Sequence, residues 1–107
     1  MDRNLPVLPL ALALAQPLPD GRRSAEIFVD GDLEIRLYAP QGHDPQTPHD
    51  RDELYIVAAG HGHFRLSDRV TAVKTGDLVF AAAHETHRFE DFSGDFAVWV
   101  VFYGPQK

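Results

Sequence analysis

Short apolar runs separated by turn-forming residues recur along most of the chain, and this rhythm limits the possible folds more than any other feature. Runs spaced about eight to twelve residues apart are typical of strands in a β-sandwich or barrel. Beyond residue 20, no stretch has the periodicity of an amphipathic helix. The predicted strands cover residues 24–29, 33–38, 53–59, 62–66, 70–73, 78–82, 87–90 and 96–103. We therefore expect an all-β fold.

The first predicted strand ends at a turn signal, and the last has a pattern that predicts its burial. Asp30-Gly31 follows the first strand, and this dipeptide favours a tight hairpin turn because both residues can reach positive φ. Alternate residues of 24–29 are then expected to share one face of the sheet. Residues 96–103 are apolar at odd and even positions alike. That pattern predicts a strand buried on both faces, either inside a sheet or under a second subunit.

Composition limits the class of protein. The chain has 107 residues, of which 44% are hydrophobic, enough for one domain with one core. Its net charge is −6 and it has no basic stripe, which argues against nucleic acid and anionic membranes as partners. The sequence contains no cysteine, which excludes disulfides, iron–sulfur ligation and a thiol nucleophile. This composition fits the reducing cytoplasm.

The N-terminal residues 5–18 form an apolar segment that Pro6 and Pro9 interrupt. The segment is shorter than the roughly 20 apolar residues that span a bilayer. We expect a short helix over residues 9–16, because proline is favoured in the first turn of a helix. The alternative is a cleaved secretory leader, although prolines are rare in such leaders. The expected parts of the chain are an N-terminal arm, residues 1–23, and a barrel, residues 24–107.

His49 and Glu53 lie four residues apart where a predicted strand begins, within the segment 42–60. Residues an even number apart in a strand share a face, so Glu53 and Tyr55 point the same way, and His49 can be brought to that side. An imidazole and a carboxylate that converge at the mouth of a sheet are typical ligands of a divalent metal. The rest of the chain must then supply a third ligand.

The same segment resembles the first motif of the cupins, a family of small barrels related to the jelly rolls. That motif contains a glycine, two histidines one residue apart, a glutamate and a second glycine. Gly42, His49, Glu53 and Gly60 stand at four of these positions. Thr47 takes the place of the first histidine.

A second segment resembles the other cupin motif, in which a glycine is followed by a proline, a glycine, a histidine and an asparagine at fixed spacings. Gly76 opens this motif, and His87 stands at the histidine position. Three positions differ, since Ala82 replaces the proline, His84 the second glycine and Asp91 the asparagine. Two spaced motifs together are a more specific signal than either one alone.

The resemblance covers roughly residues 24–104 and implies a cupin-type double-stranded β-helix with a short helical or extended N-terminal arm. It implies a metal-binding single-domain cupin that acts on a small polar organic molecule, as a non-haem metal-dependent oxygenase or isomerase. The alternatives are a non-catalytic binding or sensing module and a barrel that has lost its metal, so whether the chain is an enzyme stays open. We also expect a homodimer, because the N-terminal segment and the last strand offer more apolar surface than a small barrel can cover.

The candidate metal ligands are His49, Glu53 and His87. Two imidazoles and one carboxylate leave positions open on an octahedral ion, which suits Fe(II) first, with Mn(II), Ni(II) and Zn(II) as competitors. Gln46 and Asp44 lie nearby in the sequence, and either can supply a further oxygen, Gln46 being the candidate we carry forward.

Each ligand candidate also has an ordinary structural explanation. His87 can be a hydrogen-bonded residue of the barrel interior, and His49 can cap its loop. Glu53 can pair with Arg51 or Arg88. The coincidence of all three residues with two spaced motifs favours metal binding over these separate explanations.

Acid–base catalysis would require a group outside the ligand set. Tyr55, two residues from Glu53, and His63 are the candidates for this catalytic role. His61 and His63 share a strand face and have a simpler interpretation as solvated hairpin residues. Tyr55, Phe80, Phe89 and Trp99 are expected to be aromatic residues of the barrel, and those of them that face its interior would set the size of the ligand.

Overall fold

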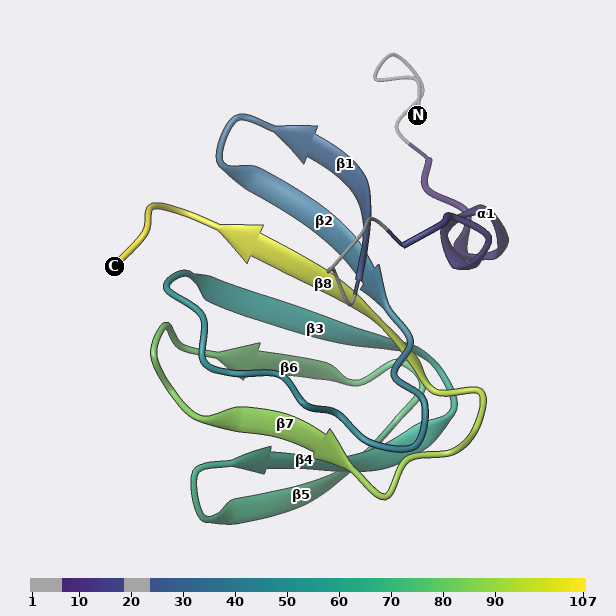
Figure 1. Cartoon of the computed structure of the whole chain (residues 1–107), viewed down its shortest axis with the longest axis vertical. Helices are drawn as coiled ribbons and strands as arrows, with labels where there is room; N and C mark the ends of the chain where they lie inside the picture. Colours follow the sequence, from purple (N-terminus) through teal and green to yellow (C-terminus); the bar gives the residue numbers. More distant parts are fainter. Residues whose placement is uncertain (1–6, 19–23) are drawn as a thin grey trace.

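The computed structural model describes residues 7–18 and 24–107 (Figure 1). Within these residues the chain forms one short helix followed by strands, as the sequence predicts. The elements are α1 (Leu10–Leu14), β1 (Ala25–Asp30), β2 (Leu33–Tyr38), β3 (Asp52–Ala59), β4 (His61–Leu66), β5 (Arg69–Lys74), β6 (Leu78–Ala81), β7 (His87–Glu90) and β8 (Ala97–Tyr103).

The strands make two antiparallel sheets that face each other. The larger sheet has the order β1-β2-β8-β3-β6, and the smaller one the order β5-β4-β7. Strand β8 lies between β2 and β3. The prediction that the last apolar run is an inner strand is therefore confirmed, as is the all-β fold class.

The first hairpin differs in two details from the expected one. Its turn residues are Gly31 and Asp32, because Asp30 already pairs with Leu33, and of the two turn residues only Gly31 has positive φ. The register of β1 also shifts between Glu26 and Phe28. A bulge of this kind adds one residue to a strand, so strict alternation along β1 does not hold.

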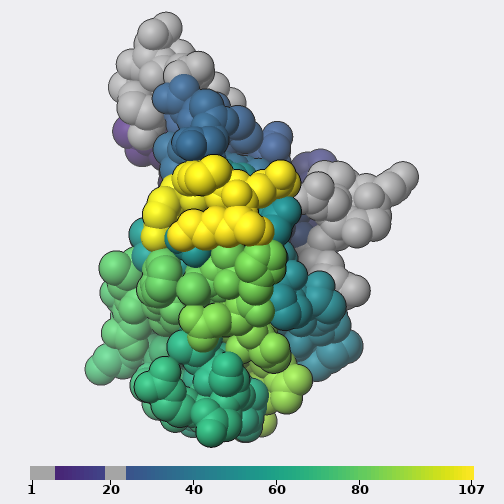
Figure 2. All heavy atoms as spheres, turned by 90° about the vertical axis from the view of Figure 1, so that its left-hand side faces the viewer, coloured from purple at the N-terminus to yellow at the C-terminus, as the bar shows by residue number. Residues whose placement is uncertain are grey.

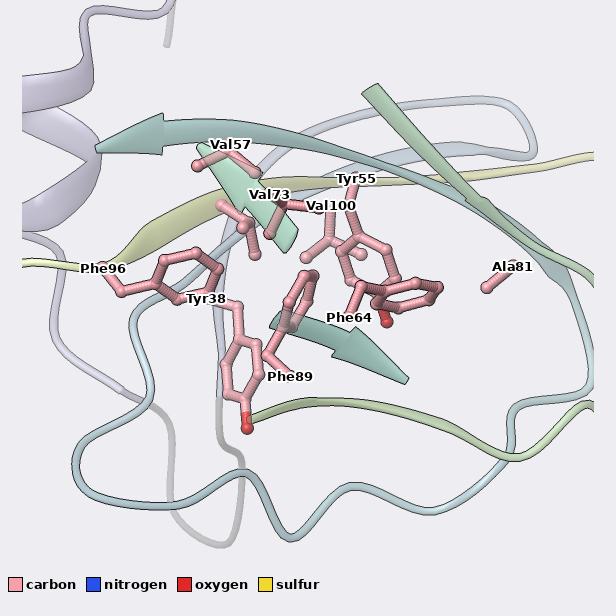
Figure 3. Packing of buried hydrophobic residues seen from close by; sticks show 10 residues of the cluster. Tyr38, Tyr55, Val57, Phe64, Val73, Ala81, Phe89, Phe96 and Val100 are labelled. Carbon is pink, nitrogen blue, oxygen red and sulfur yellow. The ribbon is translucent and has the colours of Figure 1, made fainter. Parts of the chain in front are cut away.

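The main core lies between the two sheets (Figure 3). Phe89 is at its centre, with its ring centroid 5.0 Å from that of Tyr55, 5.1 Å from that of Phe64 and 5.0 Å from that of Phe96. Burying each such side chain contributes roughly 1.5–3 kcal/mol. The buried members of this core are Tyr38, Tyr55, Val57, Phe64, Val73, Ala81, Phe89, Phe96, Val98 and Val100.

Helix α1 covers part of the outer face of the larger sheet. Its Ala13 is buried against Leu37 and Trp99 in a second apolar cluster. Pro9 stands at the N-cap with extended backbone, so the helix begins where the proline predicts. The expected helix is thus present, although it is shorter than predicted. The predicted arm includes residues 1–6 and 19–23, which lie outside the described residues, so the boundary at residue 23 stays a prediction.

The four barrel aromatics divide between the two faces of the sheets. Tyr55 and Phe89 are buried in the core. Trp99 packs with the helix on the outer face, and Phe80 is 50% exposed, so neither of these two faces the interior. The physical reason is register, since Phe80 pairs with Leu54 and Trp99 with Ile56, whose side chains alternate with the inward Glu53 and Tyr55.

None of the described residues belongs to a helix with the length and apolar character needed to cross a membrane.

Candidate metal centre

Three candidate ligands from separate parts of the chain meet at one end of the barrel. Glu53 is the second residue of β3, His87 is the first residue of β7, and His49 lies in the loop that precedes β3. Each offers a ligand atom, and these atoms all lie within 4.8 Å of one another. Strand β8 ends at the same end of the barrel, and Figure 2 looks onto that end. In this view the C-terminal segment (yellow) lies between the β1–β2 hairpin (blue) and the green segment that contains β6 and β7.

Glu53 supplies a buried carboxylate that lacks ordinary hydrogen bonds. The residue is 1% exposed, and neither of its carboxylate oxygens accepts a hydrogen bond within the described part of the chain. Its Oε1 lies 2.7 Å from Nε2 of His87 and 3.7 Å from Nε2 of His49. A buried carboxylate is costly unless positive charge matches it, and a cation between these atoms would offset that cost.

His87 presents one nitrogen to the site and uses the other to fix its ring. Its Nδ1 donates to the backbone carbonyl of Glu85 at 2.8 Å, which leaves Nε2 facing Glu53. A hydrogen bond of this type, made by the ring nitrogen that faces away from the metal, commonly orients metal-binding histidines. Burial works to lower the pKa of His87, but the contacts with the Glu53 carboxylate and the Glu85 carbonyl outweigh it and raise that pKa.

His49 reaches the site from the loop and is only partly buried. Its ring meets the ring of Phe102 edge-on at 5.4 Å, and the centroids of the His49 and His87 rings are 5.6 Å apart. The backbone carbonyl of His49 accepts a hydrogen bond from the amide of His84 at 2.7 Å. This bond ties the loop to the bend before β7 and so holds the two histidines near each other.

Gln46 lies next to the three ligand candidates. Its Oε1 accepts a hydrogen bond from the hydroxyl of Tyr55 at 3.0 Å and lies 3.4 Å from Nε2 of His49. Its amide nitrogen donates to Asp44 at 2.5 Å, so the oxygen points toward the site. The structure therefore brings Gln46 to the place where a further oxygen donor is needed.

Tyr55 adds a hydroxyl to the site. The hydroxyl lies 2.9 Å from Nε2 of His87, in addition to its bond to Gln46. Burial and the negative charge of Glu53 raise the pKa of Tyr55 well above its ordinary value. The phenol therefore stays protonated and acts as a hydrogen-bond donor rather than as a base.

The structure does not bring His63 to the site. His63 alternates along β4 with Gly62 and Phe64, and Phe64 faces the core, so His63 lies on the outer face of the smaller sheet. Its cross-strand neighbours are Ala72 and Glu90. The candidate catalytic role of His63 has no support in this placement.

The simpler explanations for Glu53 also do not describe the structure. Arg51 lies 3.6 Å from Glu34, and Arg88 lies 2.7 Å from Glu90. Neither arginine is an ion-pair partner of Glu53 among the described residues. The carboxylate thus remains available to a cation.

The three side chains fit a divalent metal. Two donors about 2.1 Å from one ion stand roughly 3 Å apart when they subtend a right angle. The separation of 2.7 Å between Glu53 and His87 is close to that value, and the 3.7 Å to His49 requires a small closure. Neutral imidazole nitrogen and carboxylate oxygen suit several first-row ions, so His49, Glu53 and His87 can bind a metal whose identity the donors do not fix.

A model of the cupin domain family matches residues 35–103 of the chain. The chain belongs to the cupin family. The resemblance of the two sequence motifs is thereby confirmed, and the two facing sheets are those of a cupin barrel.

The chain is also similar to individual proteins. An uncharacterised protein of Streptomyces coelicolor is 34% identical over 77 residues, which are 70% of this chain and 73% of the relative. The crystal structure of a cupin superfamily protein from Desulfitobacterium hafniense has a TM-score of 0.66, with 17% identity and 91% of each chain covered. The DMSP lyase of Ruegeria pomeroyi has a TM-score of 0.62, with 20% identity over 77% of this chain and 47% of that one. The likeness to the two solved structures shows a common fold.

Two departures from the cupin motif keep the backbone shape that the motif residues favour. His84, at the position of the second glycine, has φ of 70°, and Asp91, at the position of the asparagine, has φ of 47°. Glycine and asparagine tolerate positive φ best, but histidine and aspartate adopt it more readily than most residues. This cupin therefore keeps the bends around β7 with different side chains.

Sequence reasoning missed the role of Asp44. This buried carboxylate accepts hydrogen bonds from the hydroxyl of Tyr38 at 2.5 Å and from the amide of Phe89 at 2.8 Å, besides two from Gln46. It therefore ties the loop to β2 in one sheet and to β7 in the other. The sequence offered Asp44 only as a spare metal ligand, because a loop residue carries no signal for partners that lie far along the chain.

Proposed function

We propose that this cupin holds one divalent transition metal through His49, Glu53 and His87 and acts there on a small polar organic molecule. The observation that carries the proposal is the position of the buried Glu53 carboxylate, whose Oε1 lies 2.7 Å from Nε2 of His87 and 3.7 Å from Nε2 of His49. Iron(II) is the first candidate, and manganese, nickel and zinc are competitors for the same donors. Gln46 is the candidate for a fourth donor.

The adjoining cavity sets the size of the molecule. It has a volume of about 240 Å³, small for a ligand pocket, and its lining includes His49, Glu53 and Tyr55. A bound metal ion supplies positive charge that polarises an oxygen of the ligand. Tyr55 would turn its one hydroxyl proton from Gln46 to that ligand, and the apolar side chains of Val100 and Phe102 would limit the access of water. Oxygenase or isomerase chemistry is the reaction class we propose for such a site.

A non-catalytic binding or sensing role is the second candidate. The observation that favours it is the lack of a base, because the high pKa of Tyr55 keeps that phenol protonated and Glu53 is used as a ligand. Tyr38 and Arg36 also line the cavity, but a phenol and a guanidinium in their ordinary protonated forms are hydrogen-bond donors and not proton acceptors. Anaerobic loading with Fe(II), followed by assays of oxygen uptake and of product formation on a panel of small substrates, separates the two roles, since a sensor shows neither uptake nor conversion.

Metal analysis tests the proposal directly. Protein purified without a histidine tag is expected to contain metal close to one ion per chain. His87→Ala is expected to lower metal affinity about a hundredfold or more, because it removes a group that would bind the metal directly. Circular dichroism should show an intact fold.

His61→Ala is the matched control, since His61 is exposed and lies outside the ligand cluster. It should leave the metal content unchanged. Equal metal contents for His87→Ala and the wild type would show that His87 is not a ligand, and the proposal would then be wrong.

We also propose a cytoplasmic location, which the absence of cysteine supports, and a homodimer. The outer face of the larger sheet supports the dimer, because Ile56, Leu78 and Phe80 are exposed there, Leu78 by 64%. Light scattering at micromolar concentration should give twice the monomer mass, and a monomer would contradict the dimer.

A further inference from the structure

A charged residue occupies the interior of the larger sheet beside the metal site. Arg36 lies in β2 opposite Val100 of β8, and Val100 lies opposite Tyr55 of β3. The three side chains therefore stand in one row on the inner face. Arg36 lines the same cavity as His49 and Glu53, and its side chain is only 4% exposed.

The surroundings of Arg36 hold its guanidinium in place but use only part of it. Nε donates to the hydroxyl of Ser24 and Nη2 to the carbonyl of Ser24, both at 2.6 Å, and Nη1 donates to Glu34 at 2.7 Å. A guanidinium has five N–H groups, and these bonds take one from each nitrogen. One N–H on each terminal nitrogen is left over from these bonds, and two such groups form the fork that fits a carboxylate.

The charges near Arg36 also leave room for an anion. Glu34 lies between two guanidiniums, since its Oε1 is 3.6 Å from Arg51 while its Oε2 accepts from Arg36. Glu26 is 3.9 Å from Arg36, but its side chain is more than half exposed, so it offsets little of that charge. Burying a guanidinium is costly unless its charge is matched, and an apolar side chain would fill this interior position at lower cost. A ligand carboxylate would supply the match.

We propose that Arg36 binds a carboxylate of the ligand, so that this cupin takes a short-chain carboxylic acid with a second oxygen function for the metal. The inference rests on the proposed function, because the second oxygen is assigned to the site of His49, Glu53 and His87. Strand β8 separates Arg36 from Glu53, and its Val100 and Phe102 line the cavity between them. The ligand therefore has an acid group at one end, a few carbons over this apolar floor and an oxygen at the other end.

Calorimetry on Zn(II)-loaded protein tests the inference with two hydroxy acids, 3-hydroxypropanoate and 3-hydroxybutyrate, each compared with its amide. The amides keep the size and remove the negative charge. We expect the wild type to bind at least one acid about tenfold more tightly than its amide, as a charge-assisted pair requires. Arg36→Gln should abolish that preference without changing Zn(II) affinity, and Arg36→Lys should keep part of it.

Arg51→Gln is the matched control, because Arg51 contacts the same Glu34 and does not line the cavity. It should retain the preference for the acid. Equal binding of acids and amides, an undiminished preference in Arg36→Gln, or no measurable binding of either acid would overturn the inference. If Arg36→Gln fails to fold, NMR of the wild-type protein tests the inference instead. The chemical shift of the Arg36 Nε–H group must then change on titration with the acid and not with the amide.

The two proposals can fail separately. A protein that binds no metal yet prefers the acids through Arg36 contradicts the proposed function and keeps the inference. A protein that binds metal but treats acids and amides alike keeps the proposed function and contradicts the inference.

Discussion

The two ends of the barrel interior are built from the same strands but carry different side chains. On β3, Glu53 and Tyr55 point into one end and Val57 points into the other. On β8, Val98 continues the apolar end, which Phe96 completes from just before that strand. A step of two residues along a strand keeps the same face and moves about 7 Å along the barrel, so one sheet can carry both environments.

The apolar end of the interior stabilises the fold, and the polar end holds the candidate metal site. At the apolar end the rings of Phe89, Phe92 and Phe96 pack together, with centroids 5.0 Å apart for Phe89 and Phe96 and 5.3 Å for Phe92 and Phe96. At the polar end, Glu53 and Arg36 are charged and buried, which costs stability. The apolar end offsets this cost, and the two ends should therefore respond in opposite ways to substitution.

The largest effect on stability is expected from Phe96→Ala. Phe96 is fully buried, and removing its ring leaves a cavity beside Phe89 and Phe92. We expect the free energy of unfolding to fall by about 3–5 kcal/mol. Urea denaturation measures this, and the folded fraction should bind metal as the wild type does. Phe80→Ala, which truncates a half-exposed ring on the outer face, should cost much less, and an equal loss would contradict the comparison.

Glu53→Gln should show the opposite pattern at the polar end. The amide is neutral and can donate to Nε2 of His87, so the unfolding free energy of the metal-free protein should stay equal or rise by up to about 2 kcal/mol. Metal affinity should fall about a hundredfold or more because the anionic ligand is lost. Denaturation and metal titration measure the two effects. Glu26→Gln, at an exposed carboxylate, should change neither, and a clear loss of stability in Glu53→Gln would show that the carboxylate stabilises the apo fold.

Asp44→Asn tests how the loop is held at the polar end. The amide keeps the shape of the carboxylate but places an NH₂ group against donors such as Gln46 and Phe89. We expect metal affinity to fall about tenfold, because Asp44 positions the loop that carries His49, and stability to fall by about 1–3 kcal/mol. Metal titration and thermal unfolding measure these changes. Asp68→Asn, in an exposed turn, is the control, and unchanged metal affinity in Asp44→Asn would remove its positioning role.

Much of the fold followed from the sequence because strand periodicity and turn residues are local signals. The runs at 33–38 and 87–90 coincide with β2 and β7, and the other strands differ by one or two residues at their ends. What local signals do not give is the face of a strand that points inward. The sequence left the orientation of Phe80 open, because only the pairing of β6 with β3 decides which face of β6 points outward.

The residues of the site at motif positions could be predicted from the sequence, and those that depend on long-range contacts could not. His49, Glu53 and His87 stand at spaced motif positions, and the structure places their ligand atoms together. The roles of Asp44 and Arg36 depend on contacts between segments that are distant in sequence, such as the bond from the amide of Phe89 to Asp44. No motif or periodicity records such a contact.

The smallest predicted effect concerns the bend beside the polar end, where His84 has φ of 70°. Comparing His84→Gly with His84→Ala isolates the backbone, since both variants lose the imidazole and its bond to the carbonyl of Lys107. Glycine accepts this φ and alanine does not, so the glycine variant should be the more stable by about 1 kcal/mol in urea denaturation. Thr86 is exposed and lacks positive φ, so it is the control position. There Thr86→Ala should be more stable than Thr86→Gly, because glycine is the more flexible residue in the unfolded chain. Equal stabilities at position 84 would mean that the bend relaxes, and it would then not hold His49 near His87 through its backbone.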